Sequence, residues 1–174
     1  PTAIIGVSTA HGAFNADVLK AMMEVNDRPI IFPYSNPTKK SECTAEEAYA
    51  ATQGKALFAS GSPFPALEVN GKNIEPSQGN NVYIFPAMGL AVYATGSKRV
   101  TEDMFLTAAR ALAETLTQEE LDSGLLYPPR DRIRAVSGHI ACKVAEEIFD
   151  ADLATVDRPA DIAAFIKNMT YVPT

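Results

Sequence analysis

Tryptophan, cysteine and long apolar runs are absent or scarce in this chain of 174 residues. It has no tryptophan and no run of about 18 apolar residues, so we expect no membrane-spanning segment. The only cysteines, Cys43 and Cys142, lie far apart without metal-ligand spacing; a disulfide stays open, but two lone thiols favour a reducing compartment. No targeting pattern is visible, so the sequence predicts a soluble protein, of the cytoplasm first and of an organelle as the alternative.

Basic residues are outnumbered, with 15 Lys and Arg against 21 Asp and Glu. Their only adjacent pairs are Lys39-Lys40 and Lys98-Arg99, and no basic stripe could neutralise a phosphate backbone. Nucleic acid and membrane are therefore not expected as partners. The length suits one domain, or one domain with an appended piece. Because an apolar run begins directly after Pro1-Thr2, we expect the chain to be part of a longer protein.

The first sixty residues alternate short apolar runs with helical patterns. Asn15 is placed to cap one helix, and Thr44 and Glu47 have the spacing of a capping box at the start of another. The apolar runs occupy 3–7, 30–32 and 56–59. Continuous apolar strands separated by helices predict a parallel sheet covered on both faces, with right-handed connections.

After residue 60 the pattern changes. Residues 61–81 are rich in Gly, Pro, Asn and Ser and predict a loop with a small hairpin. Helical patterns follow, beginning after Pro86, at Thr101, at Thr117, after Pro129 and after Pro159. The fold class predicted is α/β: a partial parallel Rossmann-like sheet followed by a carboxyl-terminal helical segment, with the division at residues 1–85 and 86–174.

The three apolar runs all end in small or polar residues, and such strand ends form ligand sites in open parallel sheets. Asn36 is the strongest candidate, because a carboxamide suits a nicotinamide amide or a substrate carboxylate; an Asx-turn is the alternative. Asn80-Asn81 form a second candidate before an apolar stretch, with a turn again as the alternative. The three strand ends are Gly6-Val7-Ser8-Thr9, Ser35-Asn36-Pro37-Thr38 and Ser60-Gly61-Ser62-Pro63.

Several catalytic patterns are missing. No complete Gly-x-Gly-x-x-Gly follows a strand, and no carboxylate pair is placed for a divalent metal at the strand ends. His11 and His139 are far apart in sequence, and Ser35, Ser60 and Tyr83 have no evident partner base. We therefore expect the edge of a binding cleft, with no catalytic residue and no metal ligand in this chain.

Five blocks of the sequence resemble the malic enzymes, which oxidatively decarboxylate malate. They occur in the family's order with nearly its spacing, and the ending MTYVPT at 169–174 is similar to that of plant-type enzymes. The blocks are SNPT at 35–38, ECTAEEAY at 42–49, FASGSPF at 58–64, QGNNVYIFP at 78–86 and GLLYPP at 124–129.

The resemblance implies conversion of L-malate to pyruvate and carbon dioxide with NAD or NADP, and with Mg²⁺ or Mn²⁺ bound mainly by residues outside this chain. It implies malate binding by Asn36, Asn80 and the neighbouring Asn81. It implies cofactor binding by Asn36 and by the Gly6-Val7-Ser8 backbone. Two places depart from the family's pattern: Ser8-Thr9-Ala10-His11-Gly12 replaces a commonly more glycine-rich segment, and Ser77 stands where a glycine is frequent before the QGNN block.

The same resemblance implies that residues 1–85 are the second half of a dinucleotide-binding domain on which the helices of 86–174 pack. The acid, base and metal ligands would lie upstream, so the partners expected are malate, the remainder of the same enzyme and further copies in a homo-oligomer. NAD and NADP cannot be distinguished from these residues. Two alternatives stay open: a non-catalytic α/β module for binding or assembly, and another decarboxylating dehydrogenase of similar fold.

Overall fold

The computed structural model describes residues 1–171, so the last three residues of the MTYVPT ending lie outside the described part. The chain divides into two compact units. The first comprises Pro1–Asn80 and Thr117–Tyr127, and the second comprises Asn81–Leu116 and the residues from Pro128 onward. None of the helices within residues 1–171 is long and apolar enough to cross a membrane.

The first unit is built on a sheet of four parallel strands in the order β1-β2-β3-β6. The strands are β1 (Ala3–Gly6), β2 (Ile30–Pro33), β3 (Leu57–Ser60) and β6 (Ser77–Gln78). The three strands predicted from the apolar runs are confirmed, and β6 is an addition. Its two residues are too few to give an apolar pattern in the sequence.

Two helices connect the first three strands, and both begin as the sequence predicts. They are α1 (Ala16–Glu24) and α2 (Ala45–Ala51). The Asn15 side chain accepts hydrogen bonds from the backbone of the first turn of α1. Thr44 and Glu47 form a complete capping box at the start of α2.

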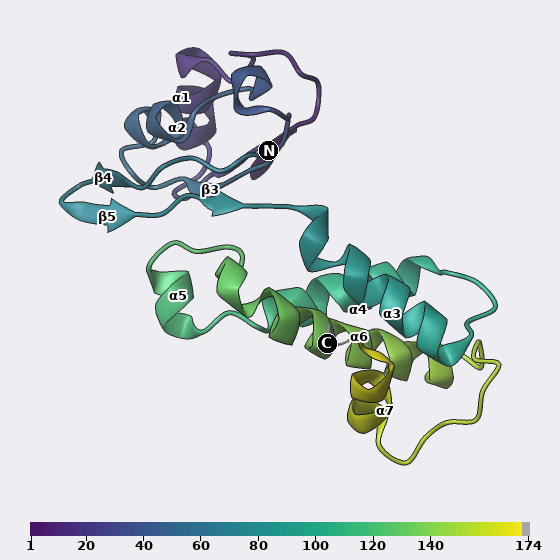
Figure 1. Ribbon diagram of the computed structural model, residues 1–174. Helices are drawn as coiled ribbons and strands as arrows, with labels where there is room; N and C mark the ends of the chain where they lie inside the picture. The colour runs from purple at the N-terminus through teal and green to yellow at the C-terminus, as the bar shows by residue number, and fades with distance from the viewer. Residues whose placement is uncertain (172–174) are drawn as a thin grey trace. The chain divides into compact units, whose positions relative to one another are not determined.

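Both helices lie on the same face of the sheet (Figure 1). The other face carries Phe32 and Tyr34, and Tyr34 is hydrogen-bonded to Tyr127 of the same unit, so a sheet covered on both faces stays a prediction. Side chains of β2 and β3 that point toward the helices, Ile31 and Phe58, are fully buried against Leu19 and Tyr49. On the other face Ile5 is 61% exposed. The reason is topological: right-handed connections that step in one direction across a sheet place both helices on one side.

The remaining elements of the first unit lie at its margins. The predicted small hairpin is present as β4 (Leu67–Val69) and β5 (Lys72–Ile74), which pair antiparallel. The short 3₁₀ helix η1 (Thr38–Lys40) precedes α2. The segment with α5 (Gln118–Asp122) joins this unit through the backbone amide of Leu126, which donates to the Ser77 hydroxyl at 2.8 Å.

The second unit is helical, as predicted. Its longest helix, α6, packs against α3, α4 and α7. The apolar stripe of α6 is buried, with Ile140, Val144 and Ile148 excluded from solvent. The elements are η2 (Asn81–Tyr83), α3 (Phe85–Thr95), α4 (Glu102–Ala113), η3 (Arg130–Arg132), α6 (Ile133–Asp150) and α7 (Ile162–Met169).

The units do not coincide with the predicted division after residue 85. The first unit ends at Asn80, and residues 117–127 return to it although they lie within the carboxyl-terminal half of the sequence. A capping box at Thr117 predicts the helix of this segment but not the unit it joins. The assignment of 1–85 to a dinucleotide-binding domain carrying the helices of 86–174 stays a prediction.

Candidate site at the strand ends

The carboxyl ends of four parallel strands meet at one edge of the sheet, and each is followed by residues predicted as candidates. Gly6 is the last residue of β1, Val7 and Ser8 follow it, and the segment after β2 holds Asn36. The Val7 side chain is 75% exposed, and Asn36 is exposed as well. Apolar and amide groups are thus available to a ligand at this edge.

The segments after β1 and β2 are joined by the carboxylate of Glu42, a residue that sequence reasoning did not select. Glu42 is fully buried. One carboxylate oxygen, Oε1, accepts from the Ser8 backbone at 3.1 Å, the Ser8 hydroxyl at 3.2 Å and the Ser35 hydroxyl at 2.5 Å. The other oxygen accepts from the Ser35 backbone at 3.4 Å. The Ser35 hydroxyl also accepts from the Thr9 backbone at 2.8 Å, so the two segments are held by a continuous network.

The Glu42 carboxylate carries its charge without a cation as hydrogen-bond or ion-pair partner within residues 1–171. Burial alone would raise its pKa, but hydrogen bonds from Ser35 and Ser8 outweigh this and hold the pKa below its usual value. The group is therefore ionised at neutral pH, stabilised by neutral hydroxyl and amide donors.

Gly6 is required by this network. A Cβ at Gly6 would lie 2.4 Å from the carboxylate carbon of Glu42 and 2.7 Å from its oxygen Oε2. Real side chains do not approach so closely, so only glycine leaves room for the Glu42 carboxylate beneath the end of β1. Gly6 thus serves packing within the chain in addition to any role toward a ligand.

Asn36 is fixed from the neighbouring strand end. Its carbonyl oxygen Oδ1 accepts a hydrogen bond from the Ser62 hydroxyl at 2.5 Å. A Cβ at Gly61 would lie 2.9 Å from the Asn36 amide nitrogen and 2.3 Å from the Tyr34 carbonyl oxygen, so Gly61 permits the close approach of the two segments. The structure brings Asn36 and Ser62 together, as the shared position of their strand ends predicts.

The end of β6 packs against Tyr34, which sequence reasoning also did not select. A Cβ at Gly79 would lie 2.8 Å from the Tyr34 ring, and the Gly79 amide donates to the Ser60 carbonyl at 2.9 Å. The Tyr34 hydroxyl is hydrogen-bonded to that of Tyr127 at 2.8 Å. Burial, followed by this hydrogen bond, raises the pKa of Tyr34, so its hydroxyl stays protonated.

The two asparagines of the QGNN block fall on either side of the boundary between the units. Asn80 is exposed at the end of the first unit, immediately after Gly79. Asn81 is exposed at the start of η2 in the second unit. Within the first unit, the order β2, β3, β6 therefore brings Asn80 to the same edge of the sheet as Asn36.

Within residues 1–171, no three His, Cys, Asp or Glu side chains lie close enough together to hold a metal ion. His11 lies at the candidate edge, but its Nδ1 is within 3.0 Å of the Ser41 carbonyl oxygen. His139 is exposed on α6 in the second unit. The two histidines therefore lie in different units of the chain.

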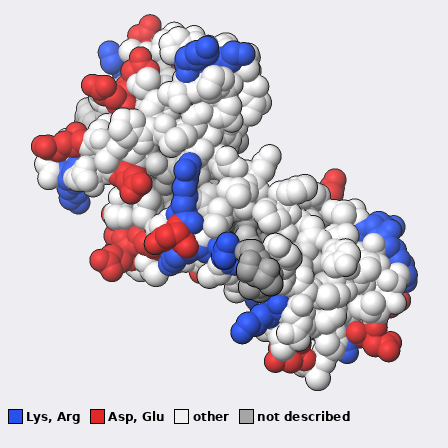
Figure 2. Space-filling model, in the orientation of Figure 1, with Lys and Arg blue, Asp and Glu red and all other residues white. Residues whose placement is uncertain are grey.

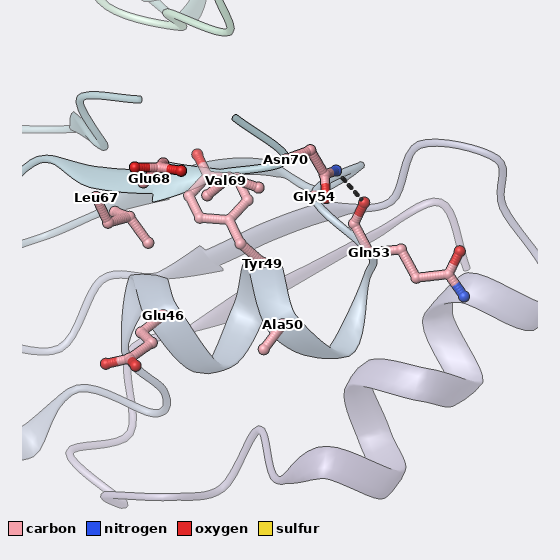
Figure 3. A pocket seen from close by; sticks show the side chains of 9 residues that line it. All are labelled: Glu46, Tyr49, Ala50, Gln53, Gly54, Leu67, Glu68, Val69 and Asn70. Carbon is pink, nitrogen blue, oxygen red and sulfur yellow. Dashed lines mark hydrogen bonds between the residues drawn. The ribbon is translucent and has the colours of Figure 1, made fainter. Parts of the chain in front are cut away.

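A pocket of about 260 Å³ lies elsewhere in the first unit, between α2 and the β4–β5 hairpin (Figure 3). Tyr49 points from α2 toward the hairpin, and the Asn70 amide donates to the Gln53 carbonyl at 2.9 Å across its margin (Figure 3). None of the predicted site residues lines this pocket. It follows the seam where the hairpin packs on the helix.

Charged side chains of both signs lie on the surface of the described residues (Figure 2). On the face in Figure 2, the acidic and basic side chains of the described residues are scattered among uncharged ones. They form no continuous basic stripe there. Such a stripe is the footprint that phosphate backbones require.

Comparison with known proteins identifies the family. Residues 1–149 match the family described as malic enzyme, NAD binding domain. The chain is 47% identical over 174 residues to the NADP-dependent malic enzyme of Vitis vinifera, covering 99% of this chain and 29% of that protein. It is 48% identical over 173 residues to that of Anas platyrhynchos, covering 98% and 31%.

A solved structure shares the fold. The structure of Entamoeba histolytica malic enzyme matches with a TM-score of 0.76 at 23% identity, covering 97% of this chain and 32% of that chain. The chain spans less than a third of the length of these relatives. Its matched residues include the whole four-stranded sheet and the segments that follow each strand. The chain belongs to the malic enzyme family.

Proposed function

We propose that this chain supplies the nicotinamide-side wall of the active site in an intact malic enzyme that converts L-malate and NADP⁺ to pyruvate, carbon dioxide and NADPH. The observation that carries the proposal is the location of the family's SNPT and QGNN blocks, which lie at the carboxyl ends of β2 and β6, the two parallel strands that flank β3. The choice of NADP rests on relatives named NADP-dependent malic enzymes.

The roles proposed for the chain's residues are binding and orientation. Asn36, held through Ser62, presents its amide nitrogen to the malate carboxylate or to the nicotinamide amide. Exposed Val7, on the Gly6-Val7-Ser8 segment, offers an apolar contact to the nicotinamide ring. Asn80 and Asn81 are proposed as further malate contacts. The cofactor accepts a hydride from malate, and these groups hold the two reactants in register.

No proton transfer or metal-dependent step is assigned to the described residues. Malate decarboxylation in this family implies Mg²⁺ or Mn²⁺, but residues 1–171 form no cluster that fits such an ion. We therefore place the metal ligands, the acid and the base outside this part of the chain. The chain alone is expected to be inactive.

Further polypeptide is proposed as a partner of this chain, and a reducing compartment as its location. Exposed Ile5 supports coverage of this part of the sheet by further polypeptide, either the remainder of an intact enzyme or a second copy. The two cysteines are free, and burial raises the pKa of the Cys43 thiol to about 12, which keeps it unreactive. Free thiols support a reducing compartment, the cytoplasm or an organelle.

The test compares two proteins: the 174-residue chain and the intact protein, meaning the product of the full open reading frame that contains it. Each is assayed with L-malate and Mn²⁺, with NADP⁺ and then with NAD⁺. We expect malate-dependent NADPH formation by the intact protein and none by the chain. Failure of the intact protein to oxidise malate would refute the proposal.

The non-catalytic alternative is motivated by the lack of a metal-binding cluster among residues 1–171, a lack that the enzymatic proposal expects as well. If the chain acts as a binding or assembly module, the intact protein should show no malate turnover, whatever the metal. The same assay therefore separates the two functions.

A further inference from the structure

Glu42 stands out among the groups to which the proposed function gives no role. It is a fully buried carboxylate, and burial of a charge without a cation is costly unless several donors compensate for it. Here Ser8 and Ser35, from the segments after β1 and β2, donate four hydrogen bonds, and the backbone of Glu42 itself adds a further one. The two segments that Glu42 joins also carry Val7 and Asn36, which are proposed to contact the ligands.

The hydrogen bonds of Glu42 connect the segment after β1 to the segment after β2. Ser8 and Ser35 are bound by the same oxygen of Glu42, and the Ser35 hydroxyl reaches on to the Thr9 backbone. The two strands pair in register only as far as Gly6 and Pro33, so beyond these residues the sheet no longer fixes the distance between the segments. Beyond the paired residues, the hydrogen bonds of Glu42 hold the two segments together.

Glu42 is itself held in place from two sides. Its backbone carbonyl accepts from the Phe14 amide at 3.0 Å, just before α1. Two residues later the Thr44 capping box begins α2. The carboxylate therefore projects from a rigid connection between both helices, which is what a group that positions loops requires.

We propose that Glu42 is a positioning residue that clamps the Gly6–Ser8 segment to Ser35 and thereby holds the cofactor-binding backbone and the Asn36 amide in one geometry. The proposal rests on the proposed function for the identity of the ligand. Glu42 touches neither cofactor nor malate; it acts through Ser8 and Ser35. Replacing its charge should therefore weaken cofactor binding even where the fold is kept.

The experiment uses the intact protein with Glu42→Gln, in which an amide nitrogen replaces one oxygen and opposes the Ser8 or Ser35 donors. We expect the KM for NADP⁺ to rise about tenfold, because losing a hydrogen bond to a charged group changes an equilibrium by about that factor. Glu42→Asp keeps the charge and should recover part of the loss. Glu46→Gln, an exposed carboxylate on α2, is the matched control and should leave KM unchanged.

A double-mutant cycle separates a clamp from a merely structural role. If Glu42 acts through Ser35, adding Ser35→Ala to Glu42→Gln should raise the KM for NADP⁺ no further than Glu42→Gln alone. Additive effects, or a lower Tm with an unchanged KM, would overturn the proposal. Should Glu42→Gln fail to fold, the cycle between Ser8→Ala and Ser35→Ala decides in the same way, because both hydroxyls bind one carboxylate oxygen.

Two separate measurements distinguish the clamp from the proposed function. Malate turnover by the wild type tests the activity. Calorimetric titration with NADP⁺ tests the clamp without any turnover, and it is repeated for each variant. A wild type that binds NADP⁺ but does not oxidise malate would refute the activity alone; equal NADP⁺ affinity in wild type and Glu42→Gln would refute the clamp alone.

Discussion

The two units of the chain bury different chemistry. Of the buried polar or charged side chains within residues 1–171, six lie in the first unit and one, Thr95, in the second. Thr95 bonds back to the Ala91 carbonyl of its own helix. The six of the first unit are Ser35, Ser41, Glu42, Thr52, Ser60 and Ser77.

The difference indicates that packing stabilises the second unit and positions particular groups in the first. In the second unit, α6 buries aliphatic side chains against α3, α4 and α7, which favours stability and places no particular group. In the first unit, Ser60 ends β3, Ser35 follows the end of β2, and Glu42 joins the segments after β1 and β2. Buried polar groups that fix strand ends are expected where a ligand must be positioned.

The strongest way to test this comparison is to disrupt the helical core. Ile140 is fully buried on α6, so Ile140→Ala should lower the free energy of unfolding by about 2–5 kcal/mol through lost apolar burial and a residual cavity. Phe105→Ala, at a side chain 55% exposed on α4, is the control and should change stability little. Denaturant unfolding of the intact protein measures both.

If the second unit contributes stability alone, the KM values of the folded Ile140→Ala protein should stay near those of the wild type. A large rise in the KM for NADP⁺ or malate would contradict it, because the second unit would then position a ligand as well.

Replacing Asn36 should lower catalytic efficiency and leave stability almost unchanged. Asn36 is exposed, and we expect Asn36→Ala in the intact protein to lower kcat/KM by about 100-fold, since a misplaced substrate costs on that order. Asn36→Asp should be worse, because it opposes a carboxylate to anionic malate. Tm should move little. Asn73→Ala, an exposed residue of β5, is the matched control. Unaltered kinetic constants for Asn36→Ala would remove Asn36 from the site.

Acid should affect the first unit through Glu42. Hydrogen bonds hold its pKa in the folded protein below the value of about 4.3 expected in an unfolded chain. Its contribution to stability is therefore fully present above about pH 4.3 and is lost as the pH falls through the lowered pKa. Glu42→Gln should be less stable at neutral pH and lose less stability in acid than the wild type. Parallel pH profiles of Tm would contradict this assignment.

The sequence was sufficient for the elements with local signals. Asn15, Thr44, Thr101 and Thr117 each accept the backbone hydrogen bonds predicted for a helix start, because capping depends on residues three positions apart. The three apolar strands and the position of Asn36 at a strand end followed from the same kind of local pattern.

What the sequence could not give depends on contacts between distant residues. Glu42 sits in a segment whose neighbours predict only a helix start, and its partner Ser8 lies 34 residues away. Tyr34 meets Tyr127 across 93 residues. No local signal marks Glu42, because the stretch between the two apolar strands also holds Lys39, Lys40, Glu46 and Glu47.

The smallest predicted effect compares the two capping boxes of the first unit. Thr44→Ala removes the box of α2, which packs on the sheet beside Glu42, and Thr117→Ala removes that of the five-residue α5. Each should cost about 1 kcal/mol of unfolding free energy. Only Thr44→Ala should also raise the KM for NADP⁺, slightly, because it loosens the connection that holds Glu42. If both variants left KM unchanged, the start of α2 would contribute to stability alone, and the clamp would depend on the hydrogen bonds of Glu42 without help from the helix that follows it.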